Sequence, residues 1–230
     1  MSGIFKFTHR WGHYHKSNVE AVFRKLKNKR AYLDLAQWQK ERLTGEKIYL
    51  KAVSIEMEDI DSFIVQATAW RKTHKQAFFS QFAPTEERTY RWVERITKDQ
   101  PDRILFVIEN HRATMLGHLD LAFVQEENTF EIGSILKGVK GHKGCMTIAL
   151  GGLCTWVFQQ FPVPYVFLRC FAHNHKAIKL YERCGFQEIQ RYPLYAHRYD
   201  NGDVVWEPAP HVSKSLTTRD CSLMRKYRES

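Results

Sequence analysis

The sequence predicts an α/β fold: a mixed, partly open central sheet of about six to seven strands, flanked by helices and preceded by an N-terminal extension. Apolar stretches of strand length alternate with helix-length ones over residues 46–207, and residues 165–171 are nearly all apolar, as in a strand buried on both faces. With 230 residues, of which 43% are hydrophobic and 26% charged, the chain has the composition of one large domain. This excludes wholesale disorder and a small disulfide-stapled protein.

The first part of this region predicts one strand and two helices. Residues 48–53 form the strand, and Ser54 is placed to cap a helix. The first turn of that helix would hold acids, which the helix dipole favours: Glu56, Glu58 and Asp59. A second helix should begin near Pro84, with one face made by Tyr90, Val93 and Ile96.

Short strands follow at residues 104–108, 116–123 and 130–136, close enough in sequence for an antiparallel meander. A turn at 138–144 leads into a helix over 145–159 that is apolar nearly all round, so we expect it to be buried.

The last part predicts a strand, a helix and a hairpin. After the strand at 165–171, Asn174 can cap a helix that Gly185 ends. Asn201-Gly202 is a strong signal for a two-residue hairpin turn between 194–199 and 204–206.

Positive charge is concentrated in the two flanks. Residues 1–45 hold ten Lys and Arg against three acids, residues 208–230 hold five against two, and residues 46–207 are neutral. We therefore divide the chain into a basic, aromatic extension packed on the core (1–45), a central domain (46–207) and a basic tail (208–230). The flanks fit an acidic ligand, although a solvated basic face that aids solubility explains them as well.

No apolar run approaches the ~18 residues that a transmembrane helix needs, and the first residues lack the features of a signal peptide. We expect a cytoplasmic protein with no membrane contact and with five reduced cysteines. The histidine pairs at 13/15 and 173/175 have no partner ligands at suitable spacing, so no metal is expected.

A strand that runs into a glycine- and lysine-rich turn and then into a buried helix can hold phosphate, because free backbone N–H groups and the helix dipole point at the anion. Lys137, Lys140 and Lys143 add positive charge there. The spacing matches neither a Walker loop nor a dinucleotide fingerprint, and a plain strand-to-helix turn remains the simpler interpretation.

Three stretches, at residues 131–136, 141–146 and 174–186, decide between these interpretations. With the order of elements, they resemble the fourth strand, the pyrophosphate loop and the late helix of the GNAT superfamily of acyl-CoA-dependent N-acyltransferases, over about residues 47–207. The third stretch matches best, at Asn174, Ala177, Leu180, Tyr181, Gly185 and Phe186. The loop departs from the family: Gly141 replaces Arg or Gln, and Met146 replaces a small residue and would crowd the phosphates.

The resemblance implies acetyl-CoA or another short acyl-CoA as co-substrate. Its pantetheine arm would bind the main chain of Ile135, Leu136 and Lys137. Its pyrophosphate would lie on the loop Lys140, Gly141, His142, Lys143, Gly144, Cys145 and Met146. Asn174 would lie near the pantetheine or the departing product, and Tyr181 would protonate the leaving thiolate, although Tyr181 could instead be a half-buried aromatic residue of a helix face.

Amide formation needs a neutral acceptor amine, so a base, or a water that it holds, must take a proton. Glu131 heads the fourth strand, where the family often has a carboxylate. Strict alternation places Leu116, His118, Asp120 and Ala122 on one face of their strand, which makes His118 and Asp120 further candidates. Each of the three could instead be structural.

The motifs do not identify the acceptor. The favoured hypothesis is a nucleotide-linked amino sugar of surface-polysaccharide biosynthesis, with the diphosphate bound by the basic extension and a homodimer left open. One alternative is an N-terminal acetyltransferase of ribosomal-protein type, which Glu131-Ile132-Gly133 resembles. The other is a CoA-sensing or nucleic-acid-binding module without turnover; Tyr181 and the acidic candidates argue against it, and a nucleic-acid partner is disfavoured.

Overall fold

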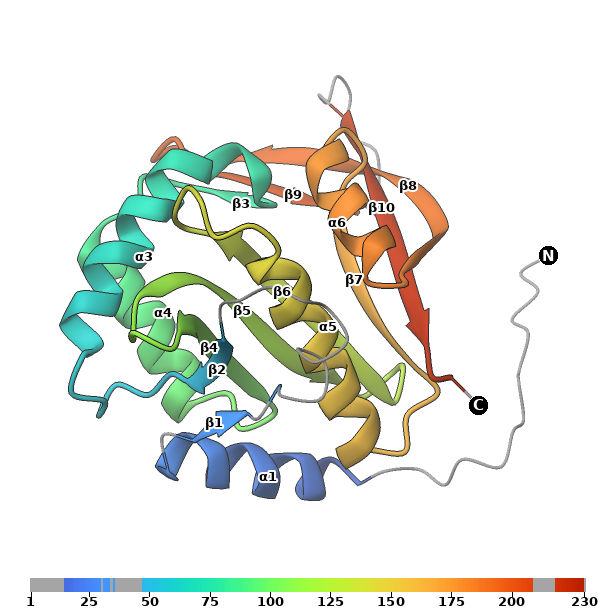
Figure 1. Ribbon diagram of the computed structural model, residues 1–230. Helices are drawn as coiled ribbons and strands as arrows, with labels where there is room; N and C mark the ends of the chain where they lie inside the picture. Colours follow the sequence, from blue (N-terminus) through green and yellow to red (C-terminus); the bar gives the residue numbers. More distant parts are fainter. Residues whose placement is uncertain (1–14, 30, 34, 36–46, 209–217, 230) are drawn as a thin grey trace.

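The computed structural model describes residues 15–29, 31–33, 35, 47–208 and 218–229. Within these residues, ten strands form one mixed sheet with the order β1-β2-β4-β5-β6-β7-β10-β8-β9-β3 (Figure 1). The strands are β1 (Tyr32–Leu33), β2 (Ile48–Ala52), β3 (Ser80–Gln81), β4 (Arg103–Asn110), β5 (Met115–Val124), β6 (Thr129–Lys137), β7 (Tyr165–Phe171), β8 (Gln187–Arg198), β9 (Val204–Glu207) and β10 (Thr218–Tyr227). The α/β class and the open, flanked sheet are confirmed, but the sheet has more strands than the six to seven predicted.

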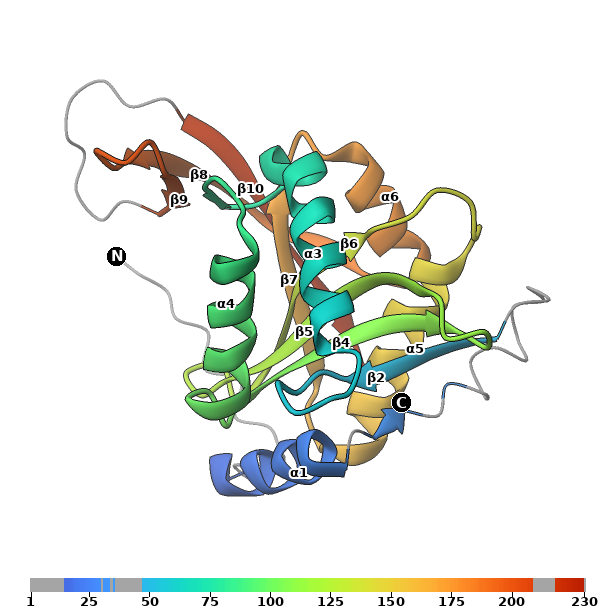
Figure 2. The ribbon, with the colours of Figure 1, turned by 90° about the vertical axis from the view of Figure 1, so that its left-hand side faces the viewer.

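Helices cover both faces of this sheet. In the described ranges they are α1 (Lys16–Lys29), α3 (Ile60–His74), α4 (Glu86–Lys98), α5 (Cys145–Gln160) and α6 (His175–Arg183), together with the 3-10 turn η1 at Lys75–Ala77. Apolar residues of α3 and α4 pack with one face of the central strands, as Figure 2 shows from their side. Residues of α1, α5 and α6 pack on the other face, which is the main core.

Helix α3 begins later than the sequence suggested. Its N-cap is Asp59, because residues 54–57 form a turn of their own, in which the Met57 N–H donates to the Ser54 carbonyl at 3.1 Å. The Ser54 hydroxyl accepts from the Glu56 N–H at 3.3 Å, so it caps this turn and not a helix. The prediction of a helix cap at Ser54 was therefore wrong. The start of α4 is two residues from the predicted one, with Thr85 as its cap.

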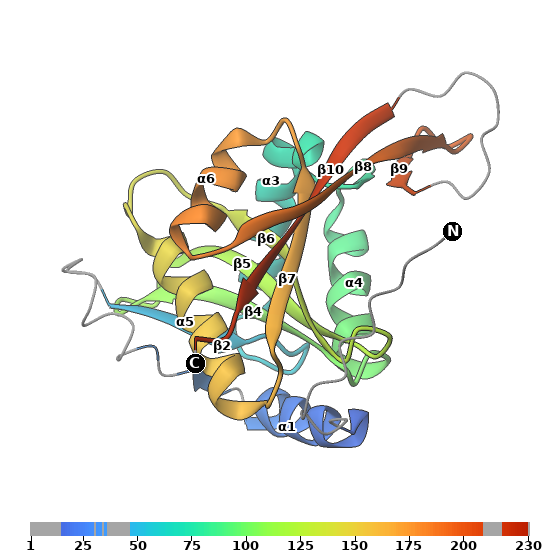
Figure 3. The same cartoon turned by 90° about the vertical axis from the view of Figure 1, so that its right-hand side faces the viewer.

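The segment after residue 207 is not simply a tail. Its residues 218–227 form β10, which pairs antiparallel with β7 on one side and β8 on the other (Figure 3). Its inward residues Cys221, Ser222 and Met224 are fully buried. The interpretation of 208–230 as a basic tail was wrong, because basic side chains at the more exposed positions of β10 outweighed a short apolar pattern.

The described part of the N-terminal extension packs on the core, as predicted. Val19 and Phe23 of α1 are fully buried, and the Phe23 ring contacts those of Phe130 and Phe161 at 6.1 and 6.4 Å. All three ribbon views place α1 at the opposite end of the molecule from β3 and β9 (Figures 1, 2 and 3). The rest of the predicted extension, residues 1–14 and 36–46 with His13, lies outside the described residues.

Two irregularities interrupt the regular pairing of β5. One lies between Ile108 and Glu109 on β4, where the register with β5 shifts. As a result, Leu116 packs in the main core, whereas His118 faces the opposite layer. The prediction that Leu116 shares one strand face with His118 was therefore wrong. The other lies opposite Ser134, whose φ of 47° is left-handed, where His118 pairs with Leu136 and Asp120 with Gly133. This bulge directs the backbone of β6 toward the cleft described next.

Candidate active site

Strands β6 and β7 pair over only a short distance. The parallel pairing is limited to Phe130 with Val166 and Glu131 with Phe167. From Ile132 onward, the edge of β6 that faces β7 has no strand partner in the described structure. Main-chain groups along this edge can therefore hydrogen-bond an extended ligand, as in strand addition. Residues 133–135 of this edge line a cleft.

The loop that follows β6 opens into the N-terminus of α5. Three of its residues have left-handed backbone, with φ of 79° at Gly141, 44° at His142 and 82° at Gly144. Gly144 is the N-cap and has no side chain that could cap the helix, so no cap side chain occupies the first-turn N–H groups, of which that of Cys145 donates to the His142 carbonyl at 3.3 Å. Lys137 fastens the loop through its Nζ, which donates to the carbonyls of Gly141 and His142. The loop thus has the geometry of an anion site.

The side chains of this loop divide by exposure. Lys140 and Lys143 are exposed and leave their charge available near the helix start. Cys145 and Met146 are buried in the main core, so they can offer a ligand only their backbone. The burial of Met146 argues against the predicted crowding, while the phosphate position on this loop stays a prediction. Gly138 starts the loop against Trp70, where a Cβ would lie only 2.0 Å from the indole ring.

A cleft of about 490 Å³ joins the open edge of β6 to α3, α4 and α6. Of the residues predicted from sequence, it brings together six side chains or main-chain positions: His118, Asp120, Glu131, Ile135, Asn174 and Tyr181. The loop residues 137–146 are not among its lining residues, and Leu136 is buried in the layer beneath α3. The cleft and the anion loop are therefore neighbouring parts of one region, joined by β6.

Asn174 and Tyr181 are positioned by helix α6. The Asn174 side chain accepts from the Ala177 N–H at 3.3 Å and so caps the helix, as predicted. About two helical turns later, Tyr181 is 5% exposed, and burial raises the pKa of its hydroxyl above the usual range. The hydroxyl is therefore protonated at neutral pH, as a proton donor to a thiolate must be, but the same burial makes it a weaker acid.

Both candidate carboxylates are held by arginines. Glu131 receives two hydrogen bonds from Arg169, at 2.8 and 2.9 Å, and is partly exposed to the cleft. Asp120 accepts from Arg103 at 2.6 Å, is 1% exposed and lies directly below Gly133. Glu131 is therefore the more accessible of the two.

His118 lies in an aromatic surrounding. Its ring packs against those of Phe63, Trp70 and Trp92, with distances of 6.3, 6.2 and 5.5 Å between the ring centres. Burial lowers the pKa of His118 to about 3, with Arg71 acting in the same direction and a hydrogen bond to the Ser134 backbone opposing it. A neutral imidazole with so low a pKa is a weak base, so the geometry favours a structural role.

A comparison with family models decides what this arrangement is. Residues 47–187, more than half of the chain, match the model of the acetyltransferase (GNAT) domain. The chain belongs to the GNAT family. It is an acyl-CoA-dependent N-acyltransferase with an acyl-CoA as co-substrate, and binding of that co-substrate at the open β6 edge and the loop before α5 stays a prediction.

Solved structures of other GNAT proteins share the fold. An acetyltransferase from Salmonella typhimurium that modifies the N-terminal serine of ribosomal protein L7/L12 has a TM-score of 0.61 and 16% identity, covering 86% of this chain and 100% of that one. The microcin C7 self-immunity acetyltransferase, solved with acetyl-CoA and AMP, has a TM-score of 0.60 and 16% identity, covering 79% and 93%. Spermidine N-acetyltransferase from Vibrio cholerae, solved with CoA and spermine, has a TM-score of 0.57 and 18% identity, covering 79% and 95%.

No curated protein sequence matches this GNAT chain. None of the helices in the described ranges is long and apolar enough to cross a bilayer. All five cysteines are buried thiols, as expected for small apolar residues.

Sequence reasoning missed the arginines of the GNAT cleft. Five of them line it: Arg71, Arg88, Arg95, Arg103 and Arg169. Arg169 interrupts an otherwise apolar strand, Tyr165–Phe171, and a charge in such a strand is a signal that it has a partner or a ligand. The others come from α3, α4 and the start of β4, which are distant in sequence, so no local pattern could have grouped them.

Proposed function

We propose that this GNAT enzyme acetylates the amino group of a small acceptor that carries phosphate, with a nucleotide-linked amino sugar as the favoured form. The supporting observation is the excess of arginine in the cleft. Five arginines line it against two carboxylates, and each carboxylate is already bound by one of them. An anionic acceptor would find uncompensated positive charge there.

Two arginines supply this charge. In the described part of the chain, no acidic side chain forms an ion pair with Arg71 or Arg95, whereas Arg88 pairs with Asp203 at 3.2 Å. Arg71 lies 3.4 Å from the centre of the Phe78 ring and donates to the Ser80 carbonyl at 2.6 Å. Burial lowers the pKa of Arg71 to about 10, so it stays charged at neutral pH. A partly desolvated guanidinium of this kind suits bidentate contact with phosphate.

The same charge disfavours a polycationic acceptor, because like charges repel strongly inside a cleft. It also changes the expected role of α1. The basic residues of α1 lie at the opposite end of the molecule from β3 and β9, so the cleft arginines and not this helix would bind the acceptor's phosphates (Figure 2). Homodimer formation and the catalytic assignments stay predictions.

In this proposal, Glu131 positions a water that takes the proton of the acceptor amine. Arg169 occupies two of the roughly four lone-pair sites of this carboxylate, which leaves the others for water. The neutral amine then attacks the thioester carbonyl, the C–S bond breaks, and Tyr181 donates its proton to the departing thiolate.

The test measures thiol release from acetyl-CoA with four acceptors: a nucleotide-linked amino sugar, the same amino sugar without the nucleotide, spermidine, and a peptide with a free N-terminus. The nucleotide-linked sugar should have the highest kcat/KM. Arg95→Gln should raise its KM about tenfold and leave the KM of acetyl-CoA unchanged. Arg91→Gln, on the same helix but outside the cleft, is the matched control.

Turnover with peptides alone would replace this proposal with an N-terminal acetyltransferase of ribosomal-protein type. A preference for spermidine would show that the cleft charge does not select the acceptor.

A further inference from the structure

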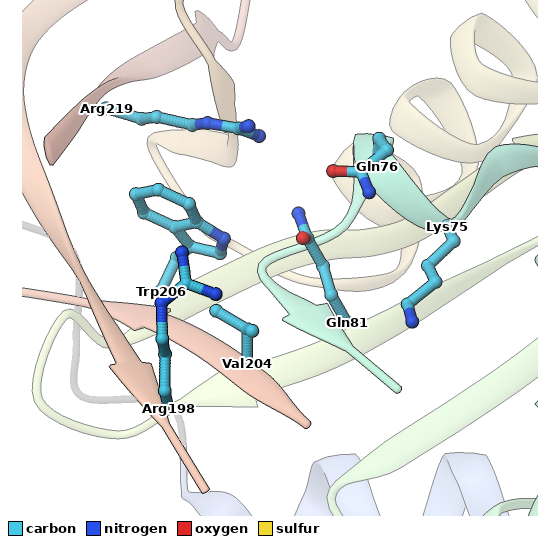
Figure 4. Close-up of a pocket in the computed structure, with 7 residues that line it drawn as sticks. All are labelled: Lys75, Gln76, Gln81, Arg198, Val204, Trp206 and Arg219. Carbon is cyan, nitrogen blue, oxygen red and sulfur yellow. The ribbon is translucent and has the colours of Figure 1, made fainter. Parts of the chain in front are cut away.

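A second, smaller pocket lies on the other side of the segment that forms the outer wall of the cleft. Its volume is about 280 Å³, and it shares no lining residue with the cleft. Seven side chains from η1, β3, β8, β9 and β10 surround it, as Figure 4 shows: Lys75, Gln76, Gln81, Arg198, Val204, Trp206 and Arg219.

The pocket is strongly basic. Three of its seven lining residues are cationic, Lys75, Arg198 and Arg219, and none is acidic. Within the described residues, none of these three forms an ion pair with a carboxylate. Arg219 lies over the rings of Trp206 and Phe171, at 4.6 and 5.4 Å from their centres. This stacking fixes one face of its guanidinium and leaves the edge, which carries the N–H donors, for another group.

Trp206 provides a second, independent sign of a ligand. Trp206 is only 5% exposed, and its indole Nε1–H is buried without a hydrogen-bond partner. Figure 4 shows the indole nitrogen on the side of the ring that faces Gln76 and Gln81 across the pocket. A buried N–H without an acceptor costs free energy, and an acceptor atom in this pocket would remove that cost.

We propose that this pocket binds an oxyanion, a phosphate or carboxylate group. Three cations attract the charge, the Trp206 indole and the amides of Gln76 and Gln81 can donate to its oxygens, and the stacked Arg219 offers a planar fork. The volume exceeds that of one such group, which leaves room for part of the molecule that carries it. This inference does not depend on the acceptor proposed for the cleft.

The pocket is physically connected to the cleft. Gln81 lines the pocket, while Ser80 and Phe82 on either side of it line the cleft. The backbone N–H of Trp206 donates to the Phe79 carbonyl at 2.8 Å. The Phe79 ring packs on the ring of Phe171, with 4.9 Å between their centres, and Arg219 lies over that Phe171 ring. An anion in the pocket would therefore hold the segment 77–82, which forms one wall of the acceptor cleft.

The test uses the full chain labelled with ¹⁵N, in which six tryptophans give six indole N–H signals. The Trp206 signal is assigned as the one missing from Trp206→Phe. Inorganic phosphate, AMP and acetate are titrated separately at constant ionic strength. We expect at least one of them to shift the Trp206 signal saturably.

Arg198→Gln and Arg219→Gln should each weaken that binding about tenfold, which corresponds to the loss of one charge-assisted hydrogen bond. Arg24→Gln, which removes the same charge from α1, should leave it unchanged. Arg198 is exposed, so its variant keeps the test valid if Arg219→Gln fails to fold.

The anion's source is distinguished in the same experiment. Competition between inorganic phosphate and a phosphate-bearing acceptor would show that the pocket holds part of the acceptor. Binding without competition would show a separate anion, and both results support the site. A Trp206 signal that no probe shifts, or equal affinity in Arg198→Gln, Arg219→Gln and Arg24→Gln, would overturn the proposal.

Discussion

His118 illustrates how a residue that looks catalytic in sequence can be structural in the fold. Its neighbours in sequence alternate regularly, but its surroundings are set by α3 and α4, which bring Trp70 and Trp92 against the imidazole. The pKa of about 3 follows from this burial and has a consequence for stability.

As pH falls, the unfolded chain binds a proton at His118 near pH 6.5, whereas the folded protein does not until about pH 3. The contribution of the neutral His118 to the free energy of unfolding is therefore fully present above pH 6.5 and is lost as the pH falls toward 3. Between pH 7 and pH 5 the loss should be about 2 kcal/mol. Urea unfolding at both pH values measures it, and His118→Gln should reduce the difference by that amount. Equal losses in both proteins would contradict the assigned pKa.

Tyr181 is the residue for which local sequence and structure agree most closely. Helix α6 begins at the predicted cap, Asn174, and it places Tyr181 in a buried position that lines the cleft. Tyr181→Phe removes only the hydroxyl. The expected result is a kcat lower by up to ~100-fold, with the affinity for acetyl-CoA, measured by calorimetry, nearly unchanged. Tyr227→Phe, at an exposed position outside the cleft, is the control. An unchanged kcat would assign Tyr181 a packing role.

Helix α1 is attached to α4 by one lysine. Lys27 is 6% exposed, and its Nζ donates to the carbonyls of Ile96 and Gln100 at 2.5 and 3.0 Å, which completes the C-terminal end of α4. Burial lowers the pKa of Lys27 to about 8. Lysine near a helix C-terminus satisfies the orphan carbonyls and the helix dipole together.

Lys27→Met should therefore lower the free energy of unfolding by about 1–3 kcal/mol, because the Ile96 and Gln100 carbonyls both lose their lysine donor, although the Gln100 carbonyl keeps the Arg103 N–H at 3.2 Å. Lys25→Met, on the exposed side of the same helix, should change it by less than about 0.5 kcal/mol. Denaturant unfolding of the three proteins provides the comparison, and similar midpoints would show that the contact contributes little.

The start of α5 allows a matched test of the phosphate position. Gly144→Glu places a carboxylate beside the N–H groups of the first helical turn, where it should weaken CoA binding by repelling the pyrophosphate. Gly202→Glu is the control, because Gly202 has nearly the same φ, 80° against 82°, in a hairpin turn outside the loop. Calorimetry with CoA should show weaker binding only for Gly144→Glu. Equal affinities would remove the pyrophosphate from this loop.

Prediction from sequence succeeded where the determining contacts are local. The cap at Asn174 and the Gly185 stop each depend on residues within a few positions, and the structure confirms both. The hairpin at Asn201-Gly202 is confirmed as well, but its turn is longer than the two residues predicted, because the last strand pair is Arg198 with Val204 and the Tyr199 N–H donates to the Asp203 carbonyl at 2.9 Å. Prediction failed at Ser54, where a turn and a helix cap use the same hydroxyl and only tertiary packing decides between them.

At the scale of the whole molecule, prediction failed where partners are distant in sequence. The strand β10 pairs with β7 some 50 positions earlier, as in Cys221 with Phe171, and no window of sequence contains both. The cleft arginines are separated in the same way. The family's order of elements gave the fold class, but it did not reveal which charges gather in the cleft.

The central position of β10 makes it essential for stability. A chain ending at Glu207 would leave β7 and β8 without the strand that joins them and would expose the partners of Cys221 and Met224. We expect that chain to lack a cooperative thermal transition, whereas a chain ending at Glu229 should unfold like the full protein. A cooperative transition at a similar temperature in the shorter chain would show that β10 is dispensable.

The same placement constrains how the protein is made. A ribosome releases β7, α6, β8 and β9 before β10, yet the sheet closes only when β10 enters the gap between β7 and β8. Until then, the nascent chain carries two unpaired strand edges, which are sites for wrong pairing and for chaperone binding. Pairing of β10 with β7 joins segments that are distant in sequence, so the intervening chain loses conformational entropy before the new contacts form. We therefore expect this pairing to be a late and slow step of biosynthetic folding.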